Sequence, residues 1–196
     1  MTLYENDLYF AKLRPDAIIP TKRDEDAGYD IYPCFDEELV VIKPGETKLI
    51  PTGIASAFHK SKYIQIEERG STGSKGIKKS AGVFDSGYRG EWKIAITNAS
   101  NVSLIIGKPT EEELLENSIL DENGDKVIKT DNGEVSLYWY SGGQYIKMYT
   151  YYPYKKAIAQ AIVHDLPVME EHKVSYEELK SFTSEREGGG FGSTNK

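Results

Sequence analysis

Two neighbouring segments carry residue types suited to binding and hydrolysing a phosphate compound. Residues 69–76 offer a guanidinium, an ammonium, three hydroxyls and unhindered backbone N–H groups, which together can surround an anion. Residues 83–90 carry one acidic side chain, Asp85, and one aromatic side chain, Tyr88. A carboxylate placed there can hold and deprotonate a water molecule. Together the two segments indicate a nucleotide site.

Each segment also has a plainer interpretation. Gly and Ser are ordinary loop residues, so residues 69–76 alone fit a polar surface turn. Asp85 alone fits a residue whose side chain caps a turn. The loop is not a P-loop, because Lys75 is followed by Gly76 rather than by Ser or Thr.

The elements that must position these residues are short β-strands between turn signals. Apolar runs at 8–13, 38–42, 47–51, 54–58 and 63–67 predict strands, and their rhythm indicates a sandwich or a jelly-roll-like barrel. Residues 83–85 and 92–96 are expected to form a hairpin with a tight connection at 86–90.

Composition limits the classes of function. The net charge of −7 argues against general nucleic-acid binding, which normally rests on a basic face. Cys34 is the only cysteine and lies outside zinc-ligand spacing with the three histidines, which disfavours a zinc deaminase. With no apolar run near membrane-span length and no signal-peptide pattern, we expect no membrane partner and a cytoplasmic location, in a bacterial host cell if the chain is viral.

Residues 101–154 differ in character from the rest. Two Asn-Gly pairs, at 123–124 and 132–133, indicate hairpin turns, and Thr110 is followed by a short helical pattern at 111–117. Seven tyrosines and Trp139 then crowd into residues 138–154. This pattern fits a self-packed β excursion, and it also fits a binding surface, since Tyr and Trp are common interface anchors.

Five stretches, in order, resemble the five motifs of the trimeric dUTPases. They are 26–31 (Asp-Ala-Gly-Tyr-Asp-Ile), 69–76 (Arg-Gly-Ser-Thr-Gly-Ser-Lys-Gly), 81–90 (Ala-Gly-Val-Phe-Asp-Ser-Gly-Tyr-Arg-Gly), 157–160 (Ala-Ile-Ala-Gln) and 186–194 (Arg-Glu-Gly-Gly-Gly-Phe-Gly-Ser-Thr). The resemblance is to phage or bacterial members with an insertion between the third and fourth motifs. It implies an all-β fold: a distorted jelly-roll β-barrel with a mostly β insertion and a mobile C-terminal arm.

The same resemblance implies a domain organisation and an assembly. The β-barrel would comprise residues 1–100 and 155–183, the insertion 101–154, and the arm that closes the active site 184–196. The family architecture is a homotrimer with its sites at subunit contacts. In some phage members the insertion takes part in regulatory protein contacts, which makes residues 101–154 a candidate partner surface.

The implied reaction is hydrolysis of dUTP to dUMP and pyrophosphate, which limits uracil incorporation into DNA and supplies dUMP for dTMP synthesis. Asp85 would activate the attacking water, and Asp30 would contact Mg²⁺ through water. The residues implied to bind substrate are Arg69, Gly70, Ser71, Gly82, Val83, Tyr88, Gln160, Arg186, Phe191, Gly192, Ser193 and Thr194. Phe191 would stack on uracil, and Tyr88 would exclude a ribose 2′-hydroxyl.

This sequence departs from the family pattern at four positions. Gly70 stands where the second motif commonly has Ser, Lys79 where many members have Asn, Glu187 where Gly is usual, and Asn195 where a terminal Gly is usual. These departures concern individual contacts and leave the implied reaction unchanged.

Two alternative functions remain open at this point. A dCTP deaminase of the same fold needs a glutamate base on the strand after the hairpin, but Ala95 occupies that position. A regulator that binds a partner through the insertion and uses nucleotide as a switch would need no water-activating base, whereas Asp85 is retained.

Overall fold

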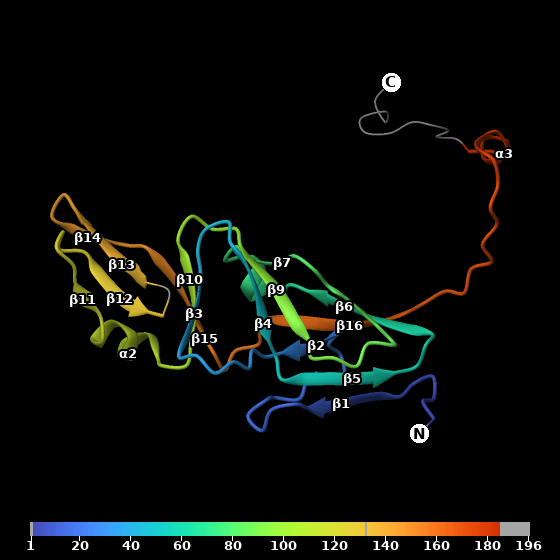
Figure 1. The fold of residues 1–196 in the computed structure, drawn as a ribbon, viewed down its shortest axis with the longest axis horizontal. Helices are drawn as coiled ribbons and strands as arrows, with labels where there is room; N and C mark the ends of the chain where they lie inside the picture. The colour runs from blue at the N-terminus through green and yellow to red at the C-terminus, as the bar shows by residue number, and fades with distance from the viewer. Residues whose placement is uncertain (1, 132, 185–196) are drawn as a thin grey trace. The chain divides into compact units, whose positions relative to one another are not determined.

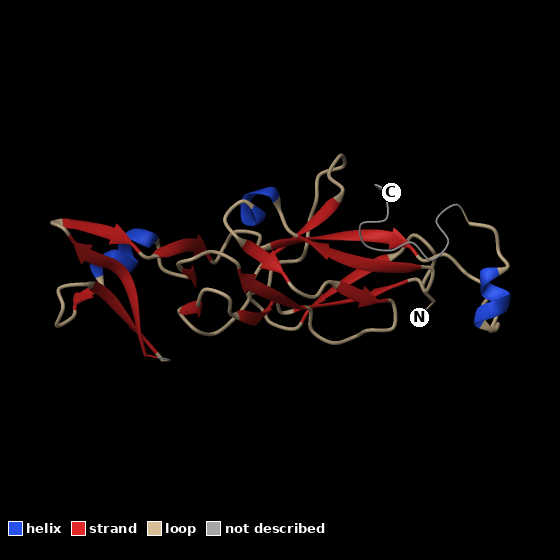
Figure 2. Ribbon diagram, turned by 90° about the horizontal axis from the view of Figure 1, so that it is seen from above, coloured by secondary structure: helices blue, strands red, loops and turns tan. Residues whose placement is uncertain are grey.

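The computed structural model describes residues 2–131 and 133–184, and most of their regular structure is β (Figure 1 and Figure 2). The strands are β1 (Leu8–Lys12), β2 (Gly28–Ile31), β3 (Leu39–Ile42), β4 (Thr47–Pro51), β5 (Ile54–Phe58), β6 (Lys62–Glu67), β7 (Ile77–Lys79), β8 (Val83–Asp85), β9 (Lys93–Asn98), β10 (Ser103–Gly107), β11 (Ile119–Leu120), β12 (Lys126–Thr130), β13 (Gly133–Ser141), β14 (Gln144–Lys147), β15 (Tyr149–Pro153) and β16 (Ala159–Asp165). The helices are short: α1 (Gly70–Gly73), α2 (Glu111–Glu116) and α3 (Tyr176–Lys180). The predicted all-β fold is confirmed.

The chain divides into two compact units, at 1–166 and 167–196. In the first unit the strand orders are β1-β5, β15-β10-β3, β4-β9-β7, β2-β16-β6-β8 and β11-β12-β13-β14. These neighbours pair antiparallel, except that β10 and β15 are parallel. As the two Asn-Gly pairs predict, β11 pairs with β12 and β12 with β13.

The first unit contains a main core and a second, smaller core. The main core is rich in isoleucine from the strands outside the insertion and holds the fully buried Trp92. The second core consists of Ile105, Leu114, Ile128, Val135, Leu137, Tyr149 and Tyr151. It therefore lies within the segment from β10 to β15, with α2 and the sheet β11 to β14 built around it.

The sheet β15-β10-β3 separates the two cores and is buried on both faces. Along β10, Leu104 and Ile106 pack in the main core, while Ile105 packs in the second core. Along β15, Tyr152 belongs to the main core and Tyr151 to the second. Successive side chains of a strand point to opposite faces, which explains why both strands are apolar without alternation. Although the sequence analysis assigns β10 and β15 to the insertion, each strand supplies part of the main core.

The predicted hairpin at 83–96 is wrong in its pairing. Strand β8 pairs with β6, whereas β9 pairs with β4 and β7. The reason lies at Glu91 and Trp92: the Glu91 carboxylate accepts a hydrogen bond from the Gly53 N–H at 2.9 Å, and the Trp92 N–H donates to the Ile54 carbonyl at 2.7 Å. With the Trp92 ring buried, the chain after Gly90 is held on β5 and cannot fold back on β8.

The described part of the second unit, residues 167–184, contains α3. The Ser175 hydroxyl accepts a hydrogen bond from the Glu178 N–H at 3.2 Å and caps this helix. Among the residues that the structure describes, no helix has the length and apolar character needed to cross a membrane.

Because both cores share β10 and β15, we predict that they unfold together. Leu137 is fully buried in the second core, so Leu137→Ala should lower the free energy of unfolding by about 2–5 kcal/mol. The chain has two tryptophans, so in a Trp139→Phe background Trp92 alone reports on the main core. Urea denaturation monitored by Trp92 fluorescence should show the whole of this decrease in the free energy of unfolding. An unchanged Trp92 midpoint, with Trp139→Phe alone as the control, would show that the second core unfolds independently.

Candidate active site

The site is built on one face of the sheet β2-β16-β6-β8. Asp30, Gln160 and Glu67 are register partners on three adjacent strands and form one row across it. The alternate residues of β6, Ile64 and Ile66, are buried on the opposite face in the main core. Alternation along the strands therefore turns the polar row away from the core.

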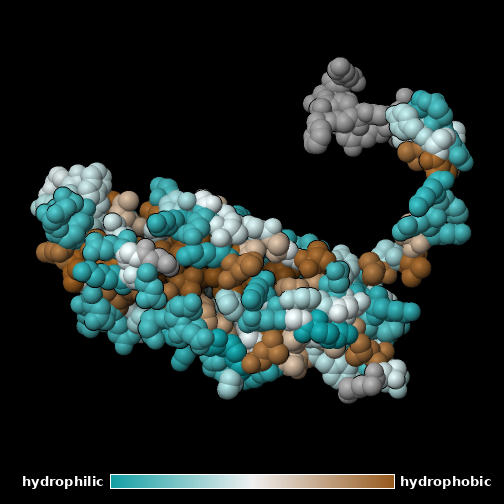
Figure 3. Space-filling model, viewed as in Figure 1, coloured by the Kyte–Doolittle hydropathy of each residue, from teal (hydrophilic) through white to brown (hydrophobic). Residues whose placement is uncertain are grey.

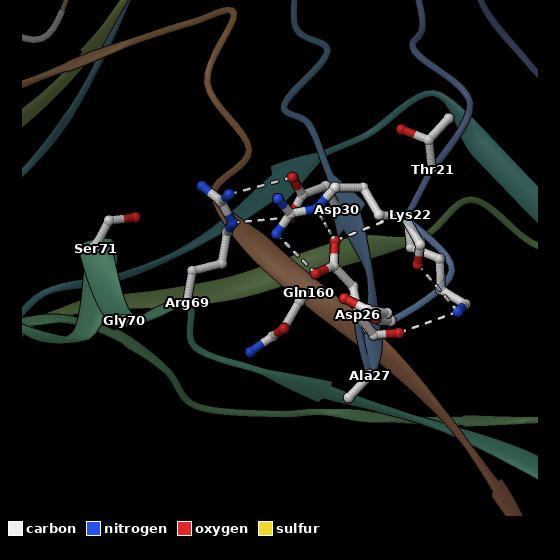
Figure 4. A pocket seen from close by; sticks show the side chains of 12 residues that line it. Thr21, Lys22, Asp26, Ala27, Asp30, Arg69, Gly70, Ser71 and Gln160 are labelled. Atoms are coloured by element: carbon white, nitrogen blue, oxygen red, sulfur yellow. Dashed lines mark hydrogen bonds and ion pairs between the residues drawn. The ribbon is translucent and has the colours of Figure 1, made fainter.

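Arg69 and Asp30 form a two-point ion pair at the end of this row (Figure 4). The Arg69 Nε lies 2.8 Å from Asp30 Oδ1, and Nη2 donates to Asp30 Oδ2 at 3.2 Å. Arg69 Nη1 donates to the Ala157 carbonyl at 3.3 Å. Each side chain of the pair is 32% exposed. An arginine has five N–H donors, so donors remain for an anion.

The loop after β6 holds the backbone of Arg69. Thr72 is fully buried, and its hydroxyl accepts from the Arg69 N–H at 3.1 Å and donates to the Arg69 carbonyl at 2.9 Å. Gly70 and Ser71, the first residues of α1, are exposed and line the same pocket as Arg69. The predicted anion loop is thus a tight turn that places Arg69, Gly70 and Ser71 together.

Gln160 lies on β16 beside this loop. Its Nε2 donates to the Glu68 carbonyl at 2.8 Å. A Cβ on Gly28 would lie only 2.8 Å from Gln160 Oε1, so the glycine of the first motif makes room for this side chain. Gln160 is half-buried and lines the pocket, and its contact with phosphate stays a prediction.

These residues surround a pocket of about 870 Å³. Its other wall is formed by Asp26, which opens the first motif, and by Thr21, Lys22, Arg23 and Glu25, which sequence reasoning missed. The loop is brought there by the backbone bridge between Thr21 and Asp30, a tertiary contact that no local pattern signals.

The cationic side chain of Arg23 is already paired in this wall. Both of its contacts with the Asp26 carboxylate measure 2.9 Å, and this hydrogen bonding holds the pKa of Asp26 below its usual value. Arg23 uses two of its donors on Asp26, and Arg69 uses three, on Asp30 and the Ala157 carbonyl, so each guanidinium keeps donors that an anion could accept.

The carboxylates of the pocket fit a magnesium ion that keeps its own water. Within residues 2–131 and 133–184, no cluster of three or more His, Cys, Asp or Glu side chains is arranged to hold a metal. A carboxylate has about four lone-pair sites, and Arg69 uses two of those on Asp30. The remaining sites suit metal-bound water, the usual way in which Mg²⁺ contacts a protein that supplies few direct ligands.

Asp85 lies far from this pocket within the chain. It pairs with Tyr63 on β6, while Asp30 is in register with Glu67 through Gln160. Four residues along β6, at roughly 3.3 Å each, and three strand spacings of about 4.8 Å separate the Cα atoms of Asp30 and Asp85. The resulting distance is about 20 Å. Asp85 instead lines a second pocket of about 450 Å³ with Lys62, Tyr63, Val83, Ser86 and Leu166.

The other residues of the third motif lie just before β8, on β8 and in the turn that follows Asp85. Val83 is 62% exposed, and the Gly82 carbonyl accepts from the Ile66 N–H at 2.7 Å. The Tyr88 ring stacks on Phe84, with centroids 5.9 Å apart, and its hydroxyl donates to the Glu91 carbonyl at 2.9 Å. A Cβ on Gly90 would lie 2.5 Å from the Tyr88 hydroxyl oxygen, so this glycine permits the ring position. Tyr88 is therefore a rigid, half-exposed platform beside Asp85.

At the position where a dCTP deaminase needs a glutamate base, this chain has no ionisable side chain. Ala95 on β9 is buried, and the nearby Glu91 carboxylate is committed to the Gly53 N–H. Lys79, the departure near the third motif, has its Nζ 3.4 Å from Glu67 Oε2.

The predicted contacts of the fifth motif cannot be placed on this site. Arg186, Phe191, Gly192, Ser193 and Thr194 lie outside the described residues. Their roles therefore stay predictions.

Comparison with known proteins agrees with this geometry. The dUTPase family model matches residues 14–110. The deoxyuridine 5'-triphosphate nucleotidohydrolase of Nautilia profundicola is 30% identical over 193 residues, covering 96% of this chain and 99% of that protein.

Two solved structures share the fold. A dUTPase of Staphylococcus bacteriophage 80alpha with dUPNHPP has a TM-score of 0.64 at 24% identity, covering 97% of this chain and 99% of that one. A mutant dUTPase of S. aureus phage phi11, described with a structural Mg(II) ion, has a TM-score of 0.57 at 23% identity, covering 86% and 97%. Because the Nautilia enzyme matches along almost its whole length, this chain belongs to the dUTPase family, the enzymes that hydrolyse dUTP.

Proposed function

We propose that this chain hydrolyses dUTP to dUMP and pyrophosphate at sites completed between the subunits of a homotrimer. The observation that carries the proposal is the separation of Asp85 from Arg69 and Asp30 by about 20 Å in one chain. One α-phosphate cannot touch both groups. In a closed symmetric oligomer, the Asp85 pocket of one copy can lie against the Arg69 pocket of another copy.

In this proposal the two pockets have separate tasks. Asp85 accepts a proton from water, whose oxygen forms a bond to the α-phosphorus as the bond to the bridging oxygen of the pyrophosphate group breaks. Arg69, Ser71 and Gln160 hold phosphate oxygens and stabilise the charge that develops there. Gly82 and Val83 offer backbone to the uracil edge, and Tyr88 packs against the deoxyribose.

Magnesium belongs to the same proposal. When bound to the triphosphate it neutralises charge, and Asp30 would contact it through water, which the free lone-pair sites of Asp30 support. A mutant phi11 dUTPase of similar fold is described with a structural Mg(II) ion.

The proposal extends to location and to the arm. We place the enzyme in the cytoplasm, where dUTP would arise, and assign to residues 184–196 the closure of the site over bound nucleotide. Arg186, Phe191, Gly192, Ser193 and Thr194 would supply that closure.

A surface for a regulatory protein partner is proposed on the insertion. Trp139 pairs with Ile146 across β13 and β14, and both side chains are about half exposed. Tyr140 and Tyr145 pair on the other face of the same hairpin. In Figure 3 the end of the first unit where β14 lies is pale to teal, with brown, apolar residues next to it. The 80alpha enzyme is described among phage dUTPases that control transfer of virulence genes by a G protein-like mechanism, which supports a regulatory role.

The reaction is tested by pyrophosphate release from dUTP, dCTP, dTTP and UTP, with and without magnesium. We expect release from dUTP that depends on magnesium, and a loss of about 10²–10⁴-fold in kcat for Asp85→Asn, because the proton acceptor is removed. Since Asp85 is exposed, the variant should fold and still bind dUTP. Equal release from all four nucleotides, or ammonia from dCTP, would refute the assignment.

Sharing of sites between subunits is tested by complementation. Asp85→Asn and Arg69→Gln, each inactive alone, are co-expressed with different tags and purified as mixed assemblies. In a trimer that contains both variants, one of the three directional subunit contacts joins an intact Asp85 to an intact Arg69, so about a third of wild-type activity should return. Sites contained in one chain would stay inactive in every mixture.

The partner surface is tested with Trp139→Ser/Ile146→Ser, which removes apolar contact area without touching either pocket. Leu49→Ser, at a 64% exposed position on β4, is the matched control. We expect a protein of the source cell to be retained by the wild type and by the control but lost by the double variant, with dUTP hydrolysis equal in all three. If the wild type, the double variant and the control all retain the same cellular proteins, this face is excluded as the partner site.

A further inference from the structure

Tyr152 links the last strand of the insertion to the phosphate pocket. It lies on β15, is 2% exposed, and packs its ring in the main core. Its hydroxyl donates to the Ala157 carbonyl at 2.5 Å. The same carbonyl accepts the bond from Arg69 Nη1 at 3.3 Å. A carbonyl oxygen has two lone pairs, so one acceptor serves both donors.

The Ala157 carbonyl needs such an anchor because it lies in the short connection between β15 and β16. That connection is a turn in which the Lys156 N–H donates to the Pro153 carbonyl at 2.9 Å. Ala157 is buried, and the Ile158 N–H donates to the Ile31 carbonyl at 2.8 Å, beside Asp30 on β2. The Tyr152 hydroxyl thus closes the turn from inside and sets where the carbonyl points.

The surroundings keep this hydroxyl in its donor form. Burial raises the pKa of Tyr152, while the neighbouring Arg69 guanidinium and Ser71 hydroxyl act in the opposite direction. The Lys75 Nζ of the anion loop lies 6.0 Å from the Tyr152 ring centroid. Three residues of the anion loop, Arg69, Ser71 and Lys75, therefore gather around one tyrosine.

We propose that Tyr152 is a positioning residue for Arg69: through the Ala157 carbonyl it fixes the guanidinium that holds the phosphate of the substrate. The inference rests on the proposed function and adds a supporting residue that belongs to the insertion segment. A small displacement of a charge-stabilising group lowers the rate of phosphoryl transfer strongly, because catalysis of this reaction depends mainly on the positions of such groups.

The test compares two hydroxyl deletions on neighbouring residues of β15. Tyr152→Phe keeps the buried ring and removes the bond to Ala157. The control, Tyr151→Phe, also removes a buried hydroxyl, which donates to the Gly107 carbonyl at 3.0 Å and has no contact with Arg69. We expect Tyr152→Phe to lower kcat/KM by about tenfold and Tyr151→Phe to leave it unchanged, with both variants folded in thermal melts.

A double-mutant cycle separates positioning from general destabilisation. Binding of a non-hydrolysable imido analogue of dUTP is measured for Tyr152→Phe, Arg69→Lys and the combination. If Tyr152 acts through Arg69, its replacement weakens binding in the wild-type background and has little further effect beside Arg69→Lys. Additive effects, or equal losses for Tyr151→Phe and Tyr152→Phe, would overturn the inference. A wild-type chain that does not hydrolyse dUTP would instead refute the proposed function.

Discussion

The ion pair between Arg69 and Asp30 is the contact on which the pocket lined by Arg69, Ser71 and Gln160 depends. It joins the loop after β6 to β2, and the third bond of Arg69 reaches the start of β16. Both partners are about one-third exposed, and pairs of this kind contribute little to folding stability. The ion pair instead fixes the orientation of the Arg69 guanidinium. Because a bidentate guanidinium has a fixed plane, its remaining N–H donors point in a defined direction.

The register of one sheet is the reason for proposing that the site is shared between copies of the chain. Asp30 and Asp85 lie on the same face of β2-β16-β6-β8, but at opposite edges and in different rows. A rigid sheet cannot bring them together by local motion, since that would break several ladder hydrogen bonds. In the proposed assembly, a second copy would supply the distant carboxylate at the surface, where no backbone pairing is lost.

The insertion, residues 101–154, is joined to the rest of the first unit through β10 and β15, whose residues pack in both cores. Strands β10 and β15 bury one face in each core, so the insertion cannot move freely without disturbing the main core. Tyr152 extends this connection from the main core to Arg69. Removing residues 101–154 as a block would therefore remove a support of the site together with the candidate partner surface.

By itself, the sequence determined the residue types of the site and most of the short strands. Arg69, Ser71, Asp85 and Tyr88 are recognisable because the chemistry needs these side chains beside turn residues, and strand alternation is a local signal. The all-β class followed from the same rhythm of short runs and turns.

Only the tertiary structure decided which of these residues meet. The partner of β8 depends on where Trp92 is buried, and the loop of Lys22 and Asp26 reaches the pocket only through the bridge from Thr21 to Asp30. The link from Tyr152 to Arg69 joins residues 83 positions apart. Such contacts are set by register and packing between distant segments, and the spacing of residues along one chain does not encode them locally.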